Sequence, residues 1–156
     1  MFGAVPPSNA RSHPSVLAPP EVLRLPHRAE SVRIARRTLR ESMVRMNLPD
    51  EFSDDAEVVI SELLGNAVRH ARAIAGGVVV MGWQLRNARL HLRVTDGGSG
   101  RTVEARKAPL TAVSGRGLHI VERLADEWGV TNHAGGLRTV WASLPLDRVP
   151  SLRLVR

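Results

Sequence analysis

Three stretches of the chain repeat apolar residues at helical spacing: residues 29–46, 53–72 and 115–127. An apolar residue at every third or fourth position forms one stripe along a helix, while charged residues fill the other sides. We therefore predict three amphipathic helices. Their expected buried residues, helix by helix, are Val32, Ala35, Leu39 and Met43; Ala56, Val59, Ile60, Leu63 and Ala67; and Leu118, Val121, Leu124 and Ala125.

Five shorter stretches have the alternation or the β-branched content typical of strands. They are residues 21–25, 78–85, 89–96, 128–133 and 137–144. The chain thus runs strand, two helices, two strands, helix, two strands. This order predicts an α+β fold, a two-layer sandwich with helices on one face of a mixed, mainly antiparallel sheet.

Local signals refine the second helix and the first hairpin. Ser53 can cap the start of the second helix, with Asp54 and Asp55 in the first turn, where the helix dipole favours acids. The turn between the second and third strands is predicted at Asn87-Ala88.

A length of 156 residues suits one domain with tails. Residues 1–20 carry five prolines among small residues and predict a flexible tail. Residues 21–146 hold all the periodic segments and form the expected domain, and residues 147–156 form a short basic tail.

Composition removes several classes of function. The chain has no cysteine, which excludes disulfides and thiolate chemistry. It also lacks an apolar run of the roughly 20 residues that a membrane span needs, so a cytoplasmic protein is expected. The net charge of +7 raises nucleic-acid binding as an alternative. We expect no direct nucleic-acid contact, because the arginines are scattered and no aromatic stacking platform accompanies them.

The first candidate cluster is Glu62 and Asn66, which lie one turn apart on the second predicted helix. Their stripe borders the buried face. A carboxylate and an amide oxygen suit a hydrated Mg²⁺, and the carboxylate can also orient an attacking hydroxyl. The alternative is that both side chains only solvate the side of the helix.

The second cluster follows the third predicted strand and reads DGGSG over residues 96–100. Because Leu90, Leu92 and Val94 alternate onto one face, Asp96 is expected to point toward the core side. A buried carboxylate needs donors, which a ligand amino group can supply, and Gly98 and Gly100 permit close backbone approach. The alternative is a simple Asp-Gly turn.

The third cluster, Gly115, Arg116 and Gly117, opens the third predicted helix just before Leu118. Free N–H groups at a helix start bind phosphate, and an arginine adds charge-assisted hydrogen bonds. The alternative is a glycine hinge beside a solvent-facing arginine.

The order of the clusters resembles the GHKL (Bergerat-fold) ATPase superfamily, in its branch of bacterial anti-sigma factors and serine-protein kinases. Residues 61–71 (SELLGNAVRHA) resemble its N box. Residues 94–100 (VTDGGSG) and 115–121 (GRGLHIV) resemble its two glycine boxes, and residues 136–141 (GLRTVW) its closing strand. The resemblance covers about residues 21–146.

The resemblance implies an ATP site and a role for each matching residue. Asn66 would bind Mg²⁺, Glu62 would polarise the attacking hydroxyl, and Asp96 would accept a hydrogen bond from adenine N6. The remaining expected nucleotide contacts are Gly98, Gly100, Gly115, Arg116, Gly117, Leu118 and Thr139, with residues 101–114 as a lid. Gly65 departs from the pattern, because the sporulation-type kinases commonly have threonine there, and this questions phosphoryl transfer more than ATP binding.

The implied function is ATP-dependent phosphorylation of a small antagonist protein, combined with sequestration of a sigma factor. A homodimer is compatible with this function. Alternatives are a non-catalytic sequestering module and a detached histidine-kinase catalytic domain. The latter is disfavoured, because no helix pair with a phospho-acceptor histidine precedes the ATP motifs.

Overall fold

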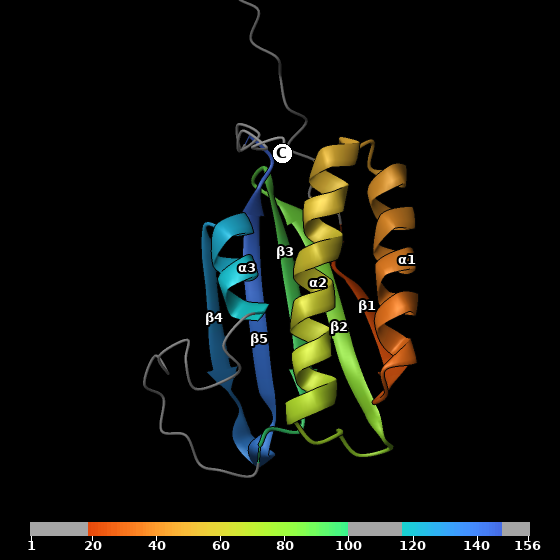
Figure 1. Cartoon of the computed structure of the whole chain (residues 1–156), viewed down its shortest axis with the longest axis vertical. Coiled ribbons are helices and arrows are strands. Elements are labelled where there is room, and N and C mark those ends of the chain that lie inside the picture. The colour runs from red at the N-terminus through yellow and green to blue at the C-terminus, as the bar shows by residue number, and fades with distance from the viewer. Residues whose placement is uncertain (1–18, 100–116, 148–156) are drawn as a thin grey trace, which may run out of the picture.

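The computed structural model describes residues 19–99 and 117–147. Within these residues the chain forms three α-helices and one five-stranded sheet. In chain order the elements are β1 (Glu21–Pro26), α1 (Glu30–Arg45), α2 (Asp50–His70), β2 (Val78–Arg86), β3 (Arg89–Asp96), α3 (Gly117–Leu124), β4 (Glu127–Asn132), a 3₁₀ turn (Ala134–Gly136) and β5 (Arg138–Pro145). The helices lie together on one face of the sheet (Figure 1), which confirms the predicted two-layer α+β fold.

The strand order is β1-β2-β3-β5-β4, so β3 occupies the centre of the sheet. Every strand pair in the described part of the chain is antiparallel, where a mixed sheet was expected. The predicted two-residue hairpin turn is confirmed. Asn87 and Ala88 both adopt positive φ angles, 52° and 55°, which match the twist of the flanking strands.

The core lies between the helix layer and the sheet. All the residues predicted to line the second helix's buried face are buried, and so are most of those predicted for the first and third helices. Val32 and Leu124 are partly buried and pack against the same core. The aliphatic stripes of all three helices therefore pack on one face of the sheet.

Two predicted helix boundaries are wrong. Helix α2 begins at Asp50. Ser53 is therefore not its cap, and its hydroxyl instead donates to the Pro49 carbonyl 3.1 Å away. Asp50 and Glu51 supply the acidic first turn that the helix dipole favours. Helix α3 ends at Leu124, because Glu127 already pairs with Ser143 as the first residue of β4.

None of the helices in the described ranges is long and apolar enough to cross a membrane.

Candidate functional site

The carboxylate of Asp96 is fully buried at the end of β3, on the sheet face that the helices cover. The expected alternation of β3 is confirmed, since Leu90, Leu92 and Val94 are buried on the same face. One oxygen, Oδ1, accepts the Gly98 N–H at 2.7 Å. The other, Oδ2, accepts a hydrogen bond from Arg138 Nη2 at 3.1 Å. Asp96 is thus a fixed hydrogen-bond acceptor at one end of the central strand.

The glycines after Asp96 let the segment that follows α2 approach closely. Arg72 and this glycine pair exchange backbone hydrogen bonds, from Gly97 N–H to Arg72 O at 2.7 Å and from Arg72 N–H to Gly98 O at 2.9 Å. A Cβ on Gly97 would lie 2.4 Å from the Ala73 carbonyl oxygen. Gly98 has a φ of +73°, and a Cβ there would lie 2.5 Å from Gly136 O. Neither position accepts a side chain without a backbone shift.

These backbone bonds hold the carboxyl-terminal end of α2 beside the end of β3. Figure 1 shows both ends at the same end of the molecule. Asn66 lies in α2, six residues before Arg72, which follows the end of the helix. The hydrogen bonds of Arg72 therefore place the carboxyl-terminal end of α2 next to the glycines that follow Asp96.

Asn66 and Glu62 occupy neighbouring turns of α2 but differ in their surroundings. Asn66 is 5% exposed, and its Oδ1 accepts a hydrogen bond from Arg69 Nη2 at 3.4 Å. Glu62 is half-buried and makes no hydrogen bond or ion pair with any residue that the structure describes. A carboxylate at the edge of the core that bonds to no described residue has oxygens that a ligand can bind.

Thr139 lies on the opposite face of the sheet from Asp96. It pairs in register with Thr95, and the two hydroxyls are 2.7 Å apart. His133 Nε2 lies 2.8 Å from the same Thr139 hydroxyl. The structure therefore does not bring Thr139 together with Asp96, although the resemblance implied a place beside adenine.

Arg138 occupies the place beside Asp96 and was not among the predicted site residues. It is the register partner of Asp96 in the β3–β5 pair, and its side chain is 14% exposed. The alternation of β5 could have identified it, because buried Val140, Ala142 and Leu144 share its parity.

Arg69 is a second basic residue that the sequence analysis missed. Its guanidinium lies over Gly65, where an added Cβ would be 3.0 Å from Arg69 Nη1. The spacing of three residues from Asn66 was the available signal, because it places both side chains on one side of the helix.

The third cluster lies mostly outside the described residues. Gly100, Gly115, Arg116 and the expected lid at 101–114 are not described, nor are most of both expected tails. Helix α3 begins at Gly117, and Leu118 is buried in the core. Leu118 therefore anchors the start of α3.

The described residues contain no group of three or more His, Asp or Glu side chains that could hold a metal ion by themselves. Mg²⁺ prefers a few oxygen ligands and keeps waters or phosphate oxygens as the others. The amide oxygen of Asn66 and the carboxylate of Glu62 are oxygen donors of this kind. The residues present thus fit a magnesium ion that is bound together with phosphates, and do not form a closed protein cage.

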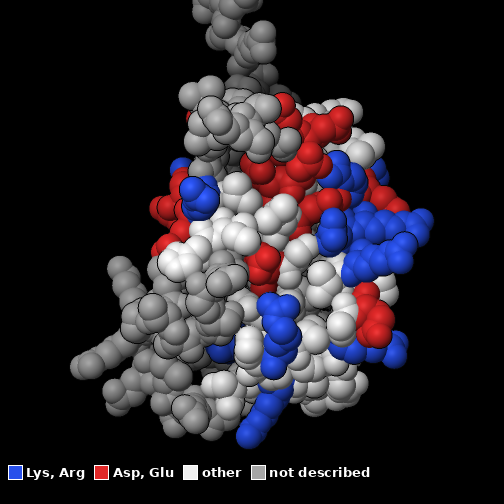
Figure 2. All heavy atoms as spheres, in the orientation of Figure 1, with Lys and Arg blue, Asp and Glu red and all other residues white. Residues whose placement is uncertain are grey.

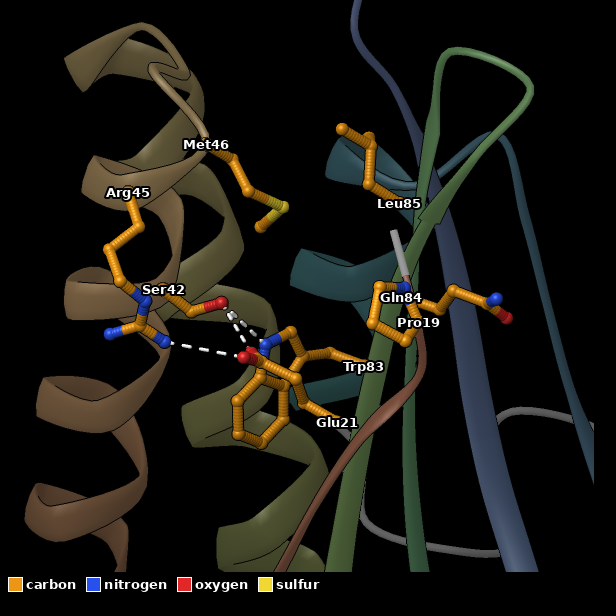
Figure 3. Close-up of a pocket in the computed structure, with 8 residues that line it drawn as sticks. All are labelled: Pro19, Glu21, Ser42, Arg45, Met46, Trp83, Gln84 and Leu85. Atoms are coloured by element: carbon orange, nitrogen blue, oxygen red, sulfur yellow. Dashed lines mark hydrogen bonds and ion pairs between the residues drawn. The ribbon is translucent and has the colours of Figure 1, made fainter. Parts of the chain in front are cut away.

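Two hollows in the described surface lie elsewhere. A pocket of about 80 Å³ lies between β1, β2 and α1 (Figure 3). There Ser42 and Arg45 donate hydrogen bonds to Glu21, and Trp83 donates one to Ser42. A wider, open groove of about 490 Å³ is lined mainly by α1 residues. Neither is lined by Asp96, Glu62 or Asn66, so the candidate site is defined by its side chains and backbone contacts.

Known proteins resemble this chain over most of the described fold. The model of the histidine kinase-like ATPase domain matches residues 25–144. Serine-protein kinase RsbW of Listeria innocua is 27% identical over 117 residues, which cover 67% of this chain and 74% of the relative. Serine-protein kinase RsbW of Staphylococcus epidermidis is 28% identical over 126 residues, which cover 72% of this chain and 79% of the relative.

A solved structure shares the fold. The crystal structure of the RsbU and RsbW domains of Rv1364c from Mycobacterium tuberculosis aligns with a TM-score of 0.64 and 23% identity. The match covers 82% of this chain and only 32% of that longer chain. Since the family model spans well over half of the sequence, the chain belongs to the histidine kinase-like ATPase domain family, and ATP is the nucleotide that this membership implies.

Proposed function

We propose that this chain is an ATP-dependent serine-protein kinase that phosphorylates a small antagonist protein and sequesters a sigma factor. One observation carries the proposal: Glu62, a carboxylate with no partner among the described residues, lies one turn from the buried amide of Asn66. The residue that follows their helix, Arg72, is hydrogen-bonded to the glycines after Asp96. The names of the relatives support a kinase that acts on serine.

In the proposed site Asp96 accepts a hydrogen bond from the amino group of adenine. Its burial favours a ligand donor, because a buried acceptor needs every partner it can obtain. Gly98 carries no side chain that could fill the space beside the base. Gly100, Gly115, Arg116 and Gly117 remain the predicted contacts for the rest of the nucleotide.

Asn66 is the proposed Mg²⁺ ligand, next to the phosphates. Arg69 lies in the last turn of α2 and Arg72 lies just after it. Figure 2 shows basic side chains over this end of the helix and acidic side chains over the opposite end. A positive field at the site favours a polyphosphate, and a bound magnesium ion would neutralise further charge on it.

Glu62 is proposed to act on the attacking serine hydroxyl. The serine oxygen forms a bond to the γ-phosphorus while the bond from that phosphorus to the β–γ bridging oxygen breaks. The hydroxyl proton passes to the Glu62 carboxylate, and ADP leaves. A half-buried carboxylate with no competing partner in the described chain suits this role.

The proposal includes two partner proteins, a homodimer and a cytoplasmic location for this chain. The antagonist would present the serine, and the sigma factor would bind the ATP-bound form. The alternative, a sequestering module that binds ATP without transfer, draws support from Gly65, because it lacks the hydroxyl common in the sporulation-type kinases.

The test is incubation of the protein with labelled ATP-Mg²⁺ and a lysate, followed by identification of the labelled protein. We expect label on the serine of a small protein. If the wild type binds ATP and labels nothing, the kinase proposal fails and the sequestering module replaces it.

Variants of α2 locate the chemistry. Glu62→Gln should leave ATP affinity nearly unchanged and slow transfer by roughly 10²–10⁴-fold, the usual contribution of a positioned base. Asn66→Ala should weaken Mg²⁺-dependent ATP binding and transfer together. Glu51→Gln, which alters an exposed glutamate on the same helix, is the matched control. Equal transfer rates for Glu62→Gln and wild type would refute the role of Glu62.

A further inference from the structure

Arg138 and Asp96 place a hydrogen-bond donor and an acceptor side by side at the end of the central strands. They are opposite residues in the β3–β5 register, and Arg138 Nη2 donates to Asp96 Oδ2 at 3.1 Å. The carboxylate is 1% exposed and the arginine side chain 14%. A pair this well buried keeps a defined geometry, unlike an arginine on an open surface.

Neither group is saturated by the contacts that the structure describes. A carboxylate offers about four acceptor positions, and Asp96 uses one on each oxygen, for Gly98 N–H and for Arg138. The Nε of Arg138 is buried and has no hydrogen-bond partner within the described part of the chain. A buried donor without a partner is costly, so a ligand acceptor at this point would be favoured.

We propose that Arg138 reads the ring nitrogen N1 of the adenine base while Asp96 accepts from its amino group. On adenine the N6 amino donor and the N1 acceptor are adjacent, so they complement an acceptor and a donor held side by side. This inference rests on the proposed nucleotide site. It adds a second, positively charged residue that recognises the base.

The ion pair does not need to break for this contact. Asp96 keeps free acceptor positions while Arg138 remains bound, and a guanidinium has five N–H donors. The contrary arrangement is a plug, in which Arg138 must leave Asp96 before any base can enter. The two arrangements predict opposite effects of removing the guanidinium: weaker ATP binding if Arg138 reads N1, and tighter binding if it is a plug.

The test compares ATP with 1-deaza-ATP, in which N1 is replaced by a C–H group, by calorimetry with the full chain and Mg²⁺. Wild type should bind ATP roughly tenfold more tightly, as expected for one hydrogen bond to a charged group. Arg138→Met should bind both nucleotides with the same, weakened affinity. Arg24→Met, which alters an exposed strand arginine on the other face of the sheet, should keep the wild-type preference.

Three results would overturn the inference. They are equal affinity of wild type for both nucleotides, an undiminished preference in Arg138→Met, and tighter ATP binding by Arg138→Met, which would establish the plug. Equal affinity of the wild type for both nucleotides refutes the inference even if Arg138→Met fails to fold. A wild type that binds ATP selectively but transfers no phosphate would refute the kinase proposal and leave this inference standing.

Discussion

Arg69 and Asn66 lie side by side on α2, with Arg69 Nη2 donating to Asn66 Oδ1 at 3.4 Å across the surface of Gly65. The arginine can take this position because residue 65 has no side chain. Gly65, which stands where the sporulation-type kinases commonly have threonine, thus leaves room for a positive charge next to the proposed magnesium ligand.

Replacing Gly65 should move Arg69 without unfolding the helix. A Cβ at residue 65 would lie 3.0 Å from Arg69 Nη1, which is the far end of a flexible side chain. Glycine is itself unfavourable inside a helix by about 1 kcal/mol relative to alanine. We expect Gly65→Ala to change the free energy of unfolding, measured with urea, by no more than about 1 kcal/mol.

The pair Gly65→Ala and Gly65→Thr separates steric displacement from the hydroxyl. If only the displaced Arg69 matters, both variants should weaken ATP-Mg²⁺ binding alike. A transfer rate that rises in Gly65→Thr and not in Gly65→Ala would assign a catalytic contribution to the hydroxyl that this chain lacks.

Asp96→Asn should weaken ATP binding by about 1–3 kcal/mol, because an acceptor for the base becomes a donor in a buried position. The free energy of unfolding should fall as well, since Arg138 loses its charged partner. Calorimetry on the folded variant measures the first effect. Unchanged ATP affinity would remove Asp96 from the site.

Gly97→Ala should disturb the nucleotide site through the backbone. Its Cβ would lie 2.4 Å from Ala73 O, so the junction between α2 and β3 must separate, and both stability and ATP affinity should decrease. Gly76→Ala is the control. It has a φ of +92° and open space around it, so it should cost only the roughly 1–2 kcal/mol of a left-handed alanine.

If Gly97→Ala binds ATP as the wild type does, the contact of Arg72 with the glycine pair does not shape the site. A loss of ATP affinity in Gly76→Ala would show that the assay responds to general destabilisation.

His91 should make stability fall in mild acid. Burial lowers the pKa of His91 below its ordinary 6.5, and the charges of Arg86 and Arg89 lower it further. The unfolded chain therefore takes up this proton at a higher pH than the folded chain. The stability that depends on a neutral His91 is fully present above pH 6.5. It is lost as the pH falls toward the folded-state pKa of His91.

Urea unfolding between about pH 5 and 8 measures this dependence. His91→Gln should flatten it, while His119→Gln, at an exposed position on α3, should not. An equal slope for wild type and His91→Gln would show that the proton is taken up elsewhere.

Much of the fold follows from periodicity. The stripes of α1 and α2 and the alternation of β3 each bury one continuous face. Such patterns can be recognised without knowing how individual side chains pack. The start of α2 could not be predicted in this way. Ser53 and Asp50 both have capping chemistry, and Ser53 instead folds back on the Pro49 carbonyl.

The placement of the candidate site residues could be predicted where it depends only on local spacing. Glu62 and Asn66 share a helix, and Asp96 ends a regular strand, so their faces follow from spacing. The position of Arg138 beside Asp96 could not be predicted, because it depends on the register between β3 and β5, which are separated by a helix and another strand. Thr139 was favoured by resemblance, although its side chain points to the other face.

The central pairing of β3 with β5 also determines when the proposed nucleotide site can form during synthesis. β2 and β3 can form a hairpin as soon as they leave the ribosome, whereas β5 must close a long loop to reach β3, at a higher entropic cost. Asp96 and Arg138 lie at the far end of that last pairing. A nascent chain that ends before β5 therefore has all three described helices but only part of the proposed base-binding site, and we expect it to bind nucleotide only after β5 has been made.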